Sequence, residues 1–200
     1  MEKTFKILLA SQNPGKLREL QAILHGLPIQ LLTPADVGIH LDIVETGSTY
    51  AENAALKSKA YADVCGLIAL ADDSGLEVDA LDGAPGLYSA RYAPGSDATD
   101  GDRRVYLLKN LLHYPRPWTA RFRATIAITL PGGETHFADG ACEGEIIPEE
   151  RGDGGFGYDP IFYIPEKDCT MAELDEAEKN RISHRARALE KAKEILRGLF

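Results

Sequence analysis

Two kinds of apolar periodicity alternate along this chain, and together they restrict its fold more than any other feature. The apolar run 5–10 leads into a loop at 11–16, and leucines and isoleucines then recur at helical spacing from Leu17 to Leu24. Segment 120–130 (ARFRATIAITL) instead alternates in the manner of a half-buried strand, and the Pro-Gly-Gly turn after it predicts a partner strand at 134–142. The pattern therefore predicts strands and helices mixed throughout.

Further elements complete this prediction. We expect strands at 67–71 and 161–164, the first closed by Asp72-Asp73-Ser74-Gly75, and helices at 49–63, around 105–112 and from about 184 to the end. Capping-box patterns mark Thr49 to Glu52 and Thr170 to Glu173. With no repeat or obvious linker, residues 1–200 are expected to form a single α/β domain, with a long mixed β-sheet, flanking helices and two lobes around a cleft.

Composition excludes several classes of protein. Of the 200 residues, 44% are hydrophobic and 26% are charged, which is typical of a globular protein and too apolar for a disordered tail. The 22 Lys and Arg against 31 Asp and Glu give a net charge of -9. That balance argues against a nucleic-acid partner, because phosphate contacts need a basic face. A small anion remains a possible ligand through local positive charge or a metal.

Membrane and disulfide signals are both lacking. No apolar run approaches the roughly 18 residues that span a bilayer, and the apolar stretch at the start is too short for a signal peptide. We therefore expect no membrane partner and a cytoplasmic location. Cys65, Cys142 and Cys169 are widely spaced and odd in number, which favours three reduced thiols over a disulfide framework or a zinc site.

The loop 11–16 is the first candidate site. Backbone N–H groups at a helix N-terminus, with Lys16 and the side chains of Ser11 and Asn13, would suit phosphate oxygens. The loop is not a P-loop, because the G-x-x-x-x-G-K pattern is absent. An ordinary Asn-Pro-Gly turn with a solvated lysine is the alternative.

Acidic residues form the second candidate. Adjacent strand residues point to opposite sides, so Asp72 and Asp73 are not expected to address one metal together. One Asp with Glu45 from a neighbouring loop would suffice for a hard cation such as Mg²⁺. Glu52 is explained by its capping role, and Asp72 could ligate metal, support Asp73 or make a structural hydrogen bond.

Two further sets contain the remaining candidates. Asn53 and Lys57 are four residues apart on one helix face, where both could meet a triphosphate, although Lys57 could equally be a solvated charge. In the glycine-rich segment 152–160, an aromatic ring could stack on a planar base and Asp159 could accept its N–H groups; a flexible loop with aromatic anchors is the alternative.

The segment 179–185 breaks a local rule. If Ser183 caps the last helix, His184 and Arg185 lie in its first turn, where the helix dipole disfavours cations. With Lys179, they could recognise a base carbonyl oxygen or balance phosphate charge. Alternatively, these groups pair with nearby glutamates such as Glu178.

Together these segments resemble the non-canonical purine nucleoside triphosphate pyrophosphatases. The matching stretches span nearly the whole chain in the right order, and they are LASQNPGKLREL at 9–20, ETGSTYAENAALKSKAYA at 45–62, ADDSGLEVDALDGAPGLYSARYA at 71–93, GGFGYDPIF at 154–162 and SHRARAL at 183–189. Ser11-Gln12 stands where relatives often have Thr-Gly, which leaves the hydroxyl in place.

The resemblance implies a two-lobed α/β homodimer that binds the triphosphate with Mg²⁺ in its central cleft. It implies hydrolysis of ITP, dITP and XTP to monophosphate and pyrophosphate, which keeps these nucleotides out of DNA and RNA. Glu45 and Asp73 are implied as metal ligands and Asp73 as the general base. The implied substrate-binding residues are Ser11, Gln12, Asn13, Pro14, Gly15, Lys16, Asn53, Lys57, Ser74, Phe156, Gly157, Tyr158, Asp159, Lys179, His184 and Arg185.

Two alternatives remain: a related enzyme and, from a different class, a binding protein without catalysis. A related Maf-like pyrophosphatase would act on pyrimidine or modified nucleotides, but the FGYD and SHR elements match the purine family specifically. A nucleotide-binding regulator that has lost catalysis is disfavoured by the presence of Lys16, Glu45 and Asp73.

Overall fold

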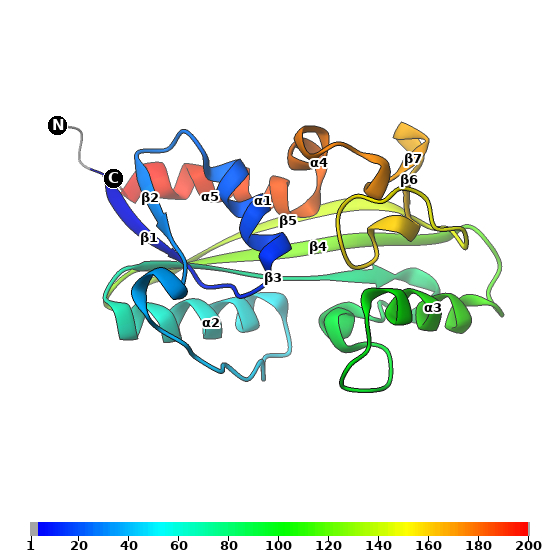
Figure 1. Ribbon diagram of the computed structural model, residues 1–200, viewed down its shortest axis with the longest axis horizontal. Coiled ribbons are helices and arrows are strands. Elements are labelled where there is room, and N and C mark those ends of the chain that lie inside the picture. The colour runs from blue at the N-terminus through cyan, green and yellow to red at the C-terminus, as the bar shows by residue number, and fades with distance from the viewer. Residues whose placement is uncertain (1–3, 200) are drawn as a thin grey trace. The chain divides into compact units, whose positions relative to one another are not determined.

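A computed structural model describes residues 4–199, and its sheet is built from segments widely separated in the sequence (Figure 1). The strands are β1 (Phe5–Leu9), β2 (Ile29–Leu32), β3 (Ile68–Val78), β4 (Trp118–Thr129), β5 (Thr135–Ile146), β6 (Phe162–Ile164) and β7 (Cys169–Thr170). The α-helices are α1 (Pro14–Leu24), α2 (Tyr50–Cys65), α3 (Asp100–Leu111), α4 (Glu176–Ile182) and α5 (His184–Leu199).

The strands of residues 4–199 form a seven-stranded sheet in the order β2-β1-β3-β4-β5-β6-β7. β1 pairs in parallel with β2 and β3, so that Ile7 lies opposite Leu31 on one side and Ile68 on the other. β6 pairs antiparallel with β5 and with β7. The sheet is therefore mixed and is flanked by helices, which confirms the expected α/β class.

The chain divides into two compact units. Within the described residues, unit 1 comprises 4–73, 124–140 and 185–199, and unit 2 comprises 74–123 and 141–184. β3, β4 and β5 each contribute residues to both units.

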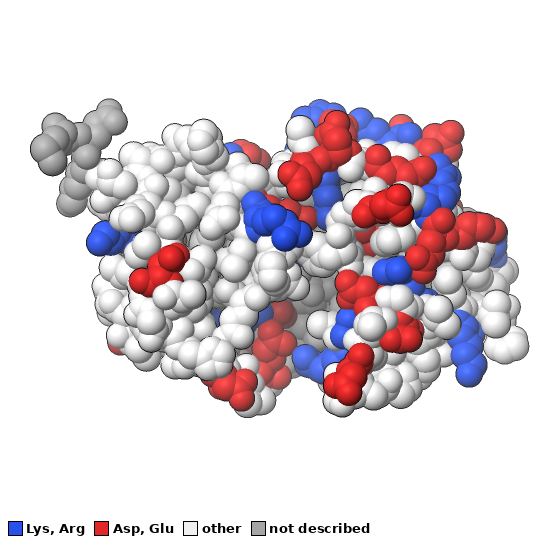
Figure 2. Space-filling model, in the orientation of Figure 1, with Lys and Arg blue, Asp and Glu red and all other residues white. Residues whose placement is uncertain are grey.

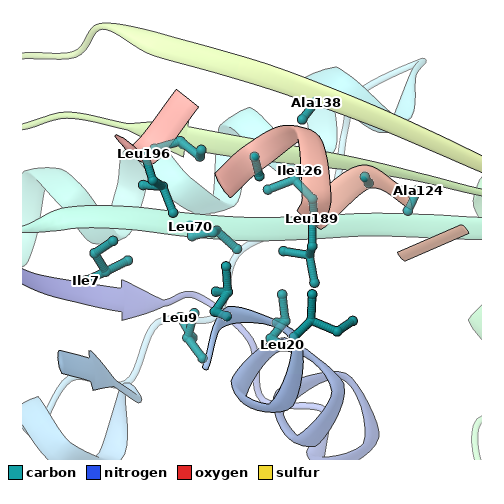
Figure 3. Close-up of a cluster of buried hydrophobic side chains, with 14 of the residues drawn as sticks. Ile7, Leu9, Leu20, Leu70, Ala124, Ile126, Ala138, Leu189 and Leu196 are labelled. Carbon is teal, nitrogen blue, oxygen red and sulfur yellow. The ribbon is translucent and has the colours of Figure 1, made fainter. Parts of the chain in front are cut away.

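Unit 1 has an apolar layer on each face of its part of the sheet. α1 and α5 lie on one face and α2 lies on the other (Figure 1). On the α1/α5 face, Leu20 and Leu189 pack with strand residues that include Leu9, Leu70 and Ile126, all fully buried (Figure 3). A second cluster joins Tyr61 and Ala62 of α2 to residues of β1 and β3. Both layers bury apolar side chains, which is the main favourable contribution to folding.

Unit 2 has its own core. Leu107 and Leu111 of α3, Phe122 of β4 and Phe162 of β6 belong to one buried cluster, and the rings of Phe122 and Phe162 lie 4.5 Å apart. On the face shown in Figure 2, the acidic and basic side chains of this unit are interspersed. No helix of residues 4–199 is both long and apolar enough to cross a membrane, and none of the three cysteines, all within that range, forms a disulfide.

Most predicted elements are confirmed, but the end predicted for β3 is wrong. We expected Asp72 to Gly75 to close the strand, whereas β3 continues to Val78. Leu76 and Val78 are fully buried, and the strand lies between β1 and β4 in the sheet. The burial of these side chains favours extended backbone through the acidic pair, whose charges are balanced by ion pairs described below. The pattern also missed β2 and α4.

The start of α2 yields a stability prediction. The Thr49 hydroxyl accepts a hydrogen bond from the Glu52 N–H (3.1 Å), and the Glu52 carboxylate accepts one from the Thr49 N–H (3.2 Å), so the predicted capping box is confirmed. Thr49→Ala should lower the free energy of unfolding by about 1 kcal/mol. Urea denaturation measures this, with exposed Ser96→Ala as a control expected to change it by less than about 0.5 kcal/mol. Equal midpoints for both variants would contradict the assignment.

Candidate functional site

The centre of the site in unit 1 is the acidic pair on β3. Asp72 and Asp73 are both buried. Asp72 contacts Lys16 of α1 and Arg185 of α5, whereas Asp73 contacts Asn53 and Lys57 of α2. Because α1 and α5 cover one face of the sheet and α2 covers the other (Figure 1), the two carboxylates serve opposite faces, as the period of two along a strand predicts.

On the α2 face, Asp73 belongs to a cluster with a second carboxylate. The Lys57 ammonium donates to Asp73 Oδ1 at 3.0 Å and to Glu45 Oε1 at 2.8 Å. Asn53 Nδ2 donates to Asp73 Oδ2 at 3.3 Å. The spacing of Asn53 and Lys57, one helical turn apart, brings both side chains to the same carboxylate.

The loop that contains Glu45 is tied to the start of α2. Asn53 Oδ1 accepts a hydrogen bond from the Gly47 N–H at 2.8 Å, and Glu52 accepts from the Ser48 N–H and hydroxyl at 2.6 and 2.7 Å. A Cβ atom at position 47 would lie 2.6 Å from Glu52 Cβ and 2.7 Å from Asn53 Oδ1. Glycine is therefore required at 47 for the close approach that places Glu45 beside Asp73.

The protonation equilibria of this cluster suit a proton acceptor. Burial raises the pKa of Asp73 above its ordinary value, and the charge of Lys57 only partly offsets this effect. For Lys57, burial lowers the pKa, but Asp73 and Glu45 outweigh it and the net shift is upward. The pKa of Asp73 is thus shifted toward neutral pH, which is the direction that a general base requires.

On the α1/α5 face, Asp72 lies within a buried charge network. Lys16 Nζ is 2.5 Å from Asp72 Oδ2, and Arg185 Nη2 and Nε each lie 3.3 Å from an Asp72 oxygen. Arg185 also donates to Glu19, one turn after Lys16 on α1. Arg185 is only 1% exposed, so its charge is compensated by these carboxylates inside the protein.

The pKa shifts of this network reflect that pairing. Burial alone would raise the pKa of Asp72, but the charges of Arg185 and Lys16 reverse the effect and hold it well below its ordinary value. Burial lowers the pKa of Lys16 despite the attraction of Asp72. Asp72 therefore remains ionised as the counter-ion of Lys16 and Arg185. Of the three roles considered for it, the geometry favours the structural one, because Asp72 accepts a hydrogen bond from Arg185.

The loop 11–16 has the geometry of a helix entry. Asn13 caps α1 by accepting a hydrogen bond from the Lys16 N–H at 3.1 Å, and the Ser11 hydroxyl accepts one from the Asn13 N–H at 3.2 Å. Pro14 begins the helix, and Gly15 beside it is buried. Gln12 Nε2 lies 3.4 Å from the Leu41 carbonyl oxygen, and Ser11 and Gln12 border a cavity of about 420 Å³. The predicted strand-loop-helix is confirmed.

The donor set around Asp73 fits a divalent cation. Glu45 and Asp73 already converge on one positive group, the Lys57 ammonium, and carboxylate oxygens suit hard cations. The cluster and network together contain three cations (Lys16, Lys57, Arg185) and four carboxylates (Glu19, Glu45, Asp72, Asp73), a formal charge of -1. Within residues 4–199, no group of three His, Cys, Asp or Glu side chains is placed to hold a metal ion.

In unit 2, a second set of predicted residues surrounds the aromatic loop, defined here as residues 155–159. Asp159 Oδ2 accepts hydrogen bonds from Lys179 Nζ at 2.7 Å and from the Phe156 N–H at 2.8 Å. Lys179 Nζ lies 4.9 Å from the centroid of the Phe156 ring. At Gly155, with φ +72°, a Cβ atom would lie 2.0 Å from Asp159 Oδ2. The loop can adopt this form only with glycine at 155.

The side chains of Tyr158 and His184 are both buried. The Tyr158 hydroxyl donates to the Ser89 carbonyl at 2.9 Å, and burial raises its pKa. His184 stacks on Phe122 with ring centroids 4.8 Å apart. Phe156 is only partly buried, which leaves it as the aromatic residue of the loop best placed to stack on a ligand. Ser74 continues β3, and its substrate contact stays a prediction.

One of the structural alternatives is wrong, and another is correct only in part. Lys57 is not a solvated charge, because it is paired with two carboxylates. Arg185 does pair with a glutamate, but this is Glu19 and not Glu178, which pairs with Lys167 and Arg181. Lys179 pairs with Asp159. Sequence reasoning also missed Glu19, whose spacing from Lys16 on α1 was the only available signal.

Comparisons with known proteins decide the family. The family model described as the Ham1 family matches residues 7–195. The chain belongs to the Ham1 family. A curated dITP/XTP pyrophosphatase from Desulforamulus reducens is 49% identical, with 98% of this chain and 97% of the relative covered. A protein of the same name from Geobacter sulfurreducens is also 49% identical, over 96% of each chain.

Solved structures of Ham1 proteins agree with this fold. A HAM1 protein from Coxiella burnetii is similar with a TM-score of 0.89 and 45% identity, covering 97% of this chain and 99% of that chain. The Staphylococcus aureus Ham1 protein gives a TM-score of 0.86 and 40% identity, covering 98% and 100%. The resemblance inferred from the motifs is thereby confirmed as family membership.

Proposed function

We propose that this Ham1 family protein hydrolyses non-canonical purine nucleoside triphosphates, namely ITP, dITP and XTP, to the monophosphate and pyrophosphate. The observation that carries the proposal is the convergence of Glu45 and Asp73 on one cation, beside a lysine-containing loop at a helix N-terminus. The names of the relatives, dITP/XTP pyrophosphatase, support the same substrate class.

The triphosphate would be bound by groups of unit 1. The N-terminus of α1 presents backbone N–H groups, which favour phosphate oxygens. Lys16 and Lys57 add positive charge, while Ser11, Gln12 and Asn13 supply polar groups from the loop. Each lysine is also held by a carboxylate, so its ammonium is positioned before the substrate arrives, which lowers the cost of reorganisation on binding.

Asp73 would act as the general base. Its raised pKa favours acceptance of a proton. The hydrogen bonds that it accepts from Asn53 and Lys57 hold the carboxylate in a fixed orientation. Water deprotonated by this carboxylate attacks the α-phosphorus, the bond from that phosphorus to the bridging oxygen breaks, and pyrophosphate leaves.

Glu45 and Asp73 would hold Mg²⁺, consistent with the net charge of this cluster and with the preference of Mg²⁺ for carboxylate and phosphate oxygens. When bound, the ion supplies neutralisation of phosphate charge.

The purine base would be recognised by groups of unit 2. Phe156 offers a ring for stacking, and Lys179 and His184 offer donors for an oxo group at the six position. The amino group of adenine would leave such donors unpaired, which opposes ATP. We further propose that the enzyme acts as a cytoplasmic homodimer and keeps these nucleotides out of DNA and RNA.

A product assay tests the proposed function. The purified protein is incubated with Mg²⁺ and separately with ITP, XTP, ATP, GTP or dTTP, and monophosphate, pyrophosphate and orthophosphate are resolved. Monophosphate and pyrophosphate from ITP and XTP, with little product from the others, are expected. Orthophosphate as the product, preference for dTTP or absence of turnover would refute the proposal. Omission of Mg²⁺ with chelator present should abolish turnover.

A further inference from the structure

Two side chains of α3 hold the backbone of the aromatic loop. Asp100 Oδ2 accepts a hydrogen bond from the Gly157 N–H at 2.8 Å, and Arg104 Nη1 donates to the Gly157 carbonyl at 2.8 Å. Both polar backbone groups of one residue are thus bound by one helix. Gly157 lies between Phe156 and Tyr158 in the chain and has φ +64°. The position of its two peptide groups therefore sets the direction of the backbone at both neighbours.

The two side chains are themselves fixed. Asp100 and Arg104 are four residues apart, which places them on one face of α3. The helix start beside them is set by a capping box between Thr99 and Asp102. Arg104 makes two parallel hydrogen bonds to Glu150, from Nε at 2.8 Å and from Nη2 at 3.0 Å, and Asp100 Oδ1 accepts from Arg103 at 2.7 Å. Such bidentate pairing restricts the orientation of the guanidinium.

Two other groups of the aromatic loop make hydrogen bonds that do not involve α3. The Phe156 N–H is held by Asp159, and the Tyr158 hydroxyl by Ser89. Phe156 therefore stands between two fixed backbone positions, one bound by Asp159 and one by the α3 pair. Release of Gly157 would let the Phe156 ring change direction relative to Lys179, 4.9 Å from it.

We propose that Asp100 and Arg104 are positioning residues that set base specificity by clamping Gly157, an inference that rests on the proposed role of the aromatic loop in base recognition. They act through the loop backbone and not on the phosphates. The clamp should therefore matter for ligands that carry a purine and not for tripolyphosphate, which has none.

The decisive variant is Arg104→Met, with Arg121→Met as the matched control. Arg121 is also in unit 2 and is paired with Asp79 and Glu143, but it contacts no residue of the aromatic loop in the hydrogen bonds described. Loss of one charge-assisted hydrogen bond should raise KM for ITP by about tenfold, with kcat changed by less than about twofold. The preference for ITP over ATP should fall, and inhibition by tripolyphosphate should be unchanged. Arg121→Met should match the wild type.

Conservative variants separate positioning from general damage. Asp100→Asn keeps an oxygen that can accept from the Gly157 N–H but loses the one that accepts from Arg103, so its KM should rise less than that of Asp100→Ala. If Arg104→Met does not fold, Glu150→Gln, which weakens the support of Arg104, should give a smaller rise in KM of the same kind. The proposal is overturned if the clamp variants keep the wild-type KM and ITP preference, or if tripolyphosphate inhibition weakens in parallel with ITP.

Failure of the proposed function would give a different experimental result from failure of the clamp proposal. If the wild type does not hydrolyse ITP, the proposed function fails, and the clamp is measured by equilibrium dialysis with ITP and tripolyphosphate. Arg104→Met must then weaken ITP binding alone. Absence of ITP binding by the wild type would overturn both proposals.

Discussion

Asp73→Asn is expected to lower kcat for ITP by about 10² to 10⁴-fold, the usual contribution of a general base. Asparagine preserves the shape of the side chain, but its amide cannot accept the proton. Nucleotide binding should persist, because Lys16, Lys57 and the α1 N-terminus are unchanged. Single-turnover kinetics and equilibrium dialysis with ITP measure the two effects separately.

The matched control for this substitution is Asp63→Asn. Asp63 is exposed on α2, the helix that also contains Asn53 and Lys57, and the variant should retain wild-type kcat. Near-normal turnover by Asp73→Asn would remove Asp73 from its role. Loss of ITP binding with equal loss of turnover would instead assign Asp73 to binding.

Asp72→Asn should reduce stability more than any other polar substitution discussed here. It leaves Lys16 and Arg185 without their shared carboxylate inside the protein, and breaking a buried ion pair in this way costs about 3 to 5 kcal/mol. Urea denaturation at pH 7 measures the change in the free energy of unfolding. Exposed Asp42→Asn is the control, with an expected change of less than about 0.5 kcal/mol.

The pH dependence of this difference has a definite sign. The pKa of Asp72 is held below its ordinary value in the folded protein, because Arg185 and Lys16 outweigh the effect of burial. Its contribution to stability is therefore fully present above the unfolded pKa of about 4 and is lost as the pH falls toward the folded value. The difference between wild type and Asp72→Asn should be constant from pH 5 to 7, a range chosen above that pKa, and should shrink below about pH 4.

A difference that grows on acidification would contradict the pairing of Asp72 with these cations. If Asp72→Asn does not fold, Glu19→Gln tests the same network from its other end. Glu19 binds Arg185 and is more accessible than Asp72, with 12% of its side chain exposed against none. A smaller loss of stability at pH 7 is therefore expected.

Local patterns were enough to predict much of this molecule. The capping box at Thr49 and the strand-loop-helix at 5–24 depend on neighbouring residues, and both are confirmed. The opposite orientation of Asp72 and Asp73 follows from the geometry of any extended strand. Such features need no knowledge of the rest of the fold.

The sequence alone does not predict which distant residues contact one another. Arg185 and Glu19 are 166 residues apart and Arg104 and Gly157 are 53 apart, so no spacing rule connects them. β2 escaped prediction because its four residues, IQLL, are too few to show a period. α4 has seven mostly polar residues, EAEKNRI, and no apolar stripe.

The alternation of Asp72 and Asp73 along β3 also limits which insertions and deletions this chain can tolerate. Addition or removal of one residue within β3 before Asp72 would rotate each carboxylate to the other face of the sheet. The Asp73 carboxylate would then face Lys16 and Arg185, while Asp72 would face α2 and Glu45. Loops can lengthen at little energetic cost, but β3 cannot change length before this pair without separating the acids from their partners, because even a two-residue change, which keeps each acid on its face, moves it about 6.6 Å along the strand.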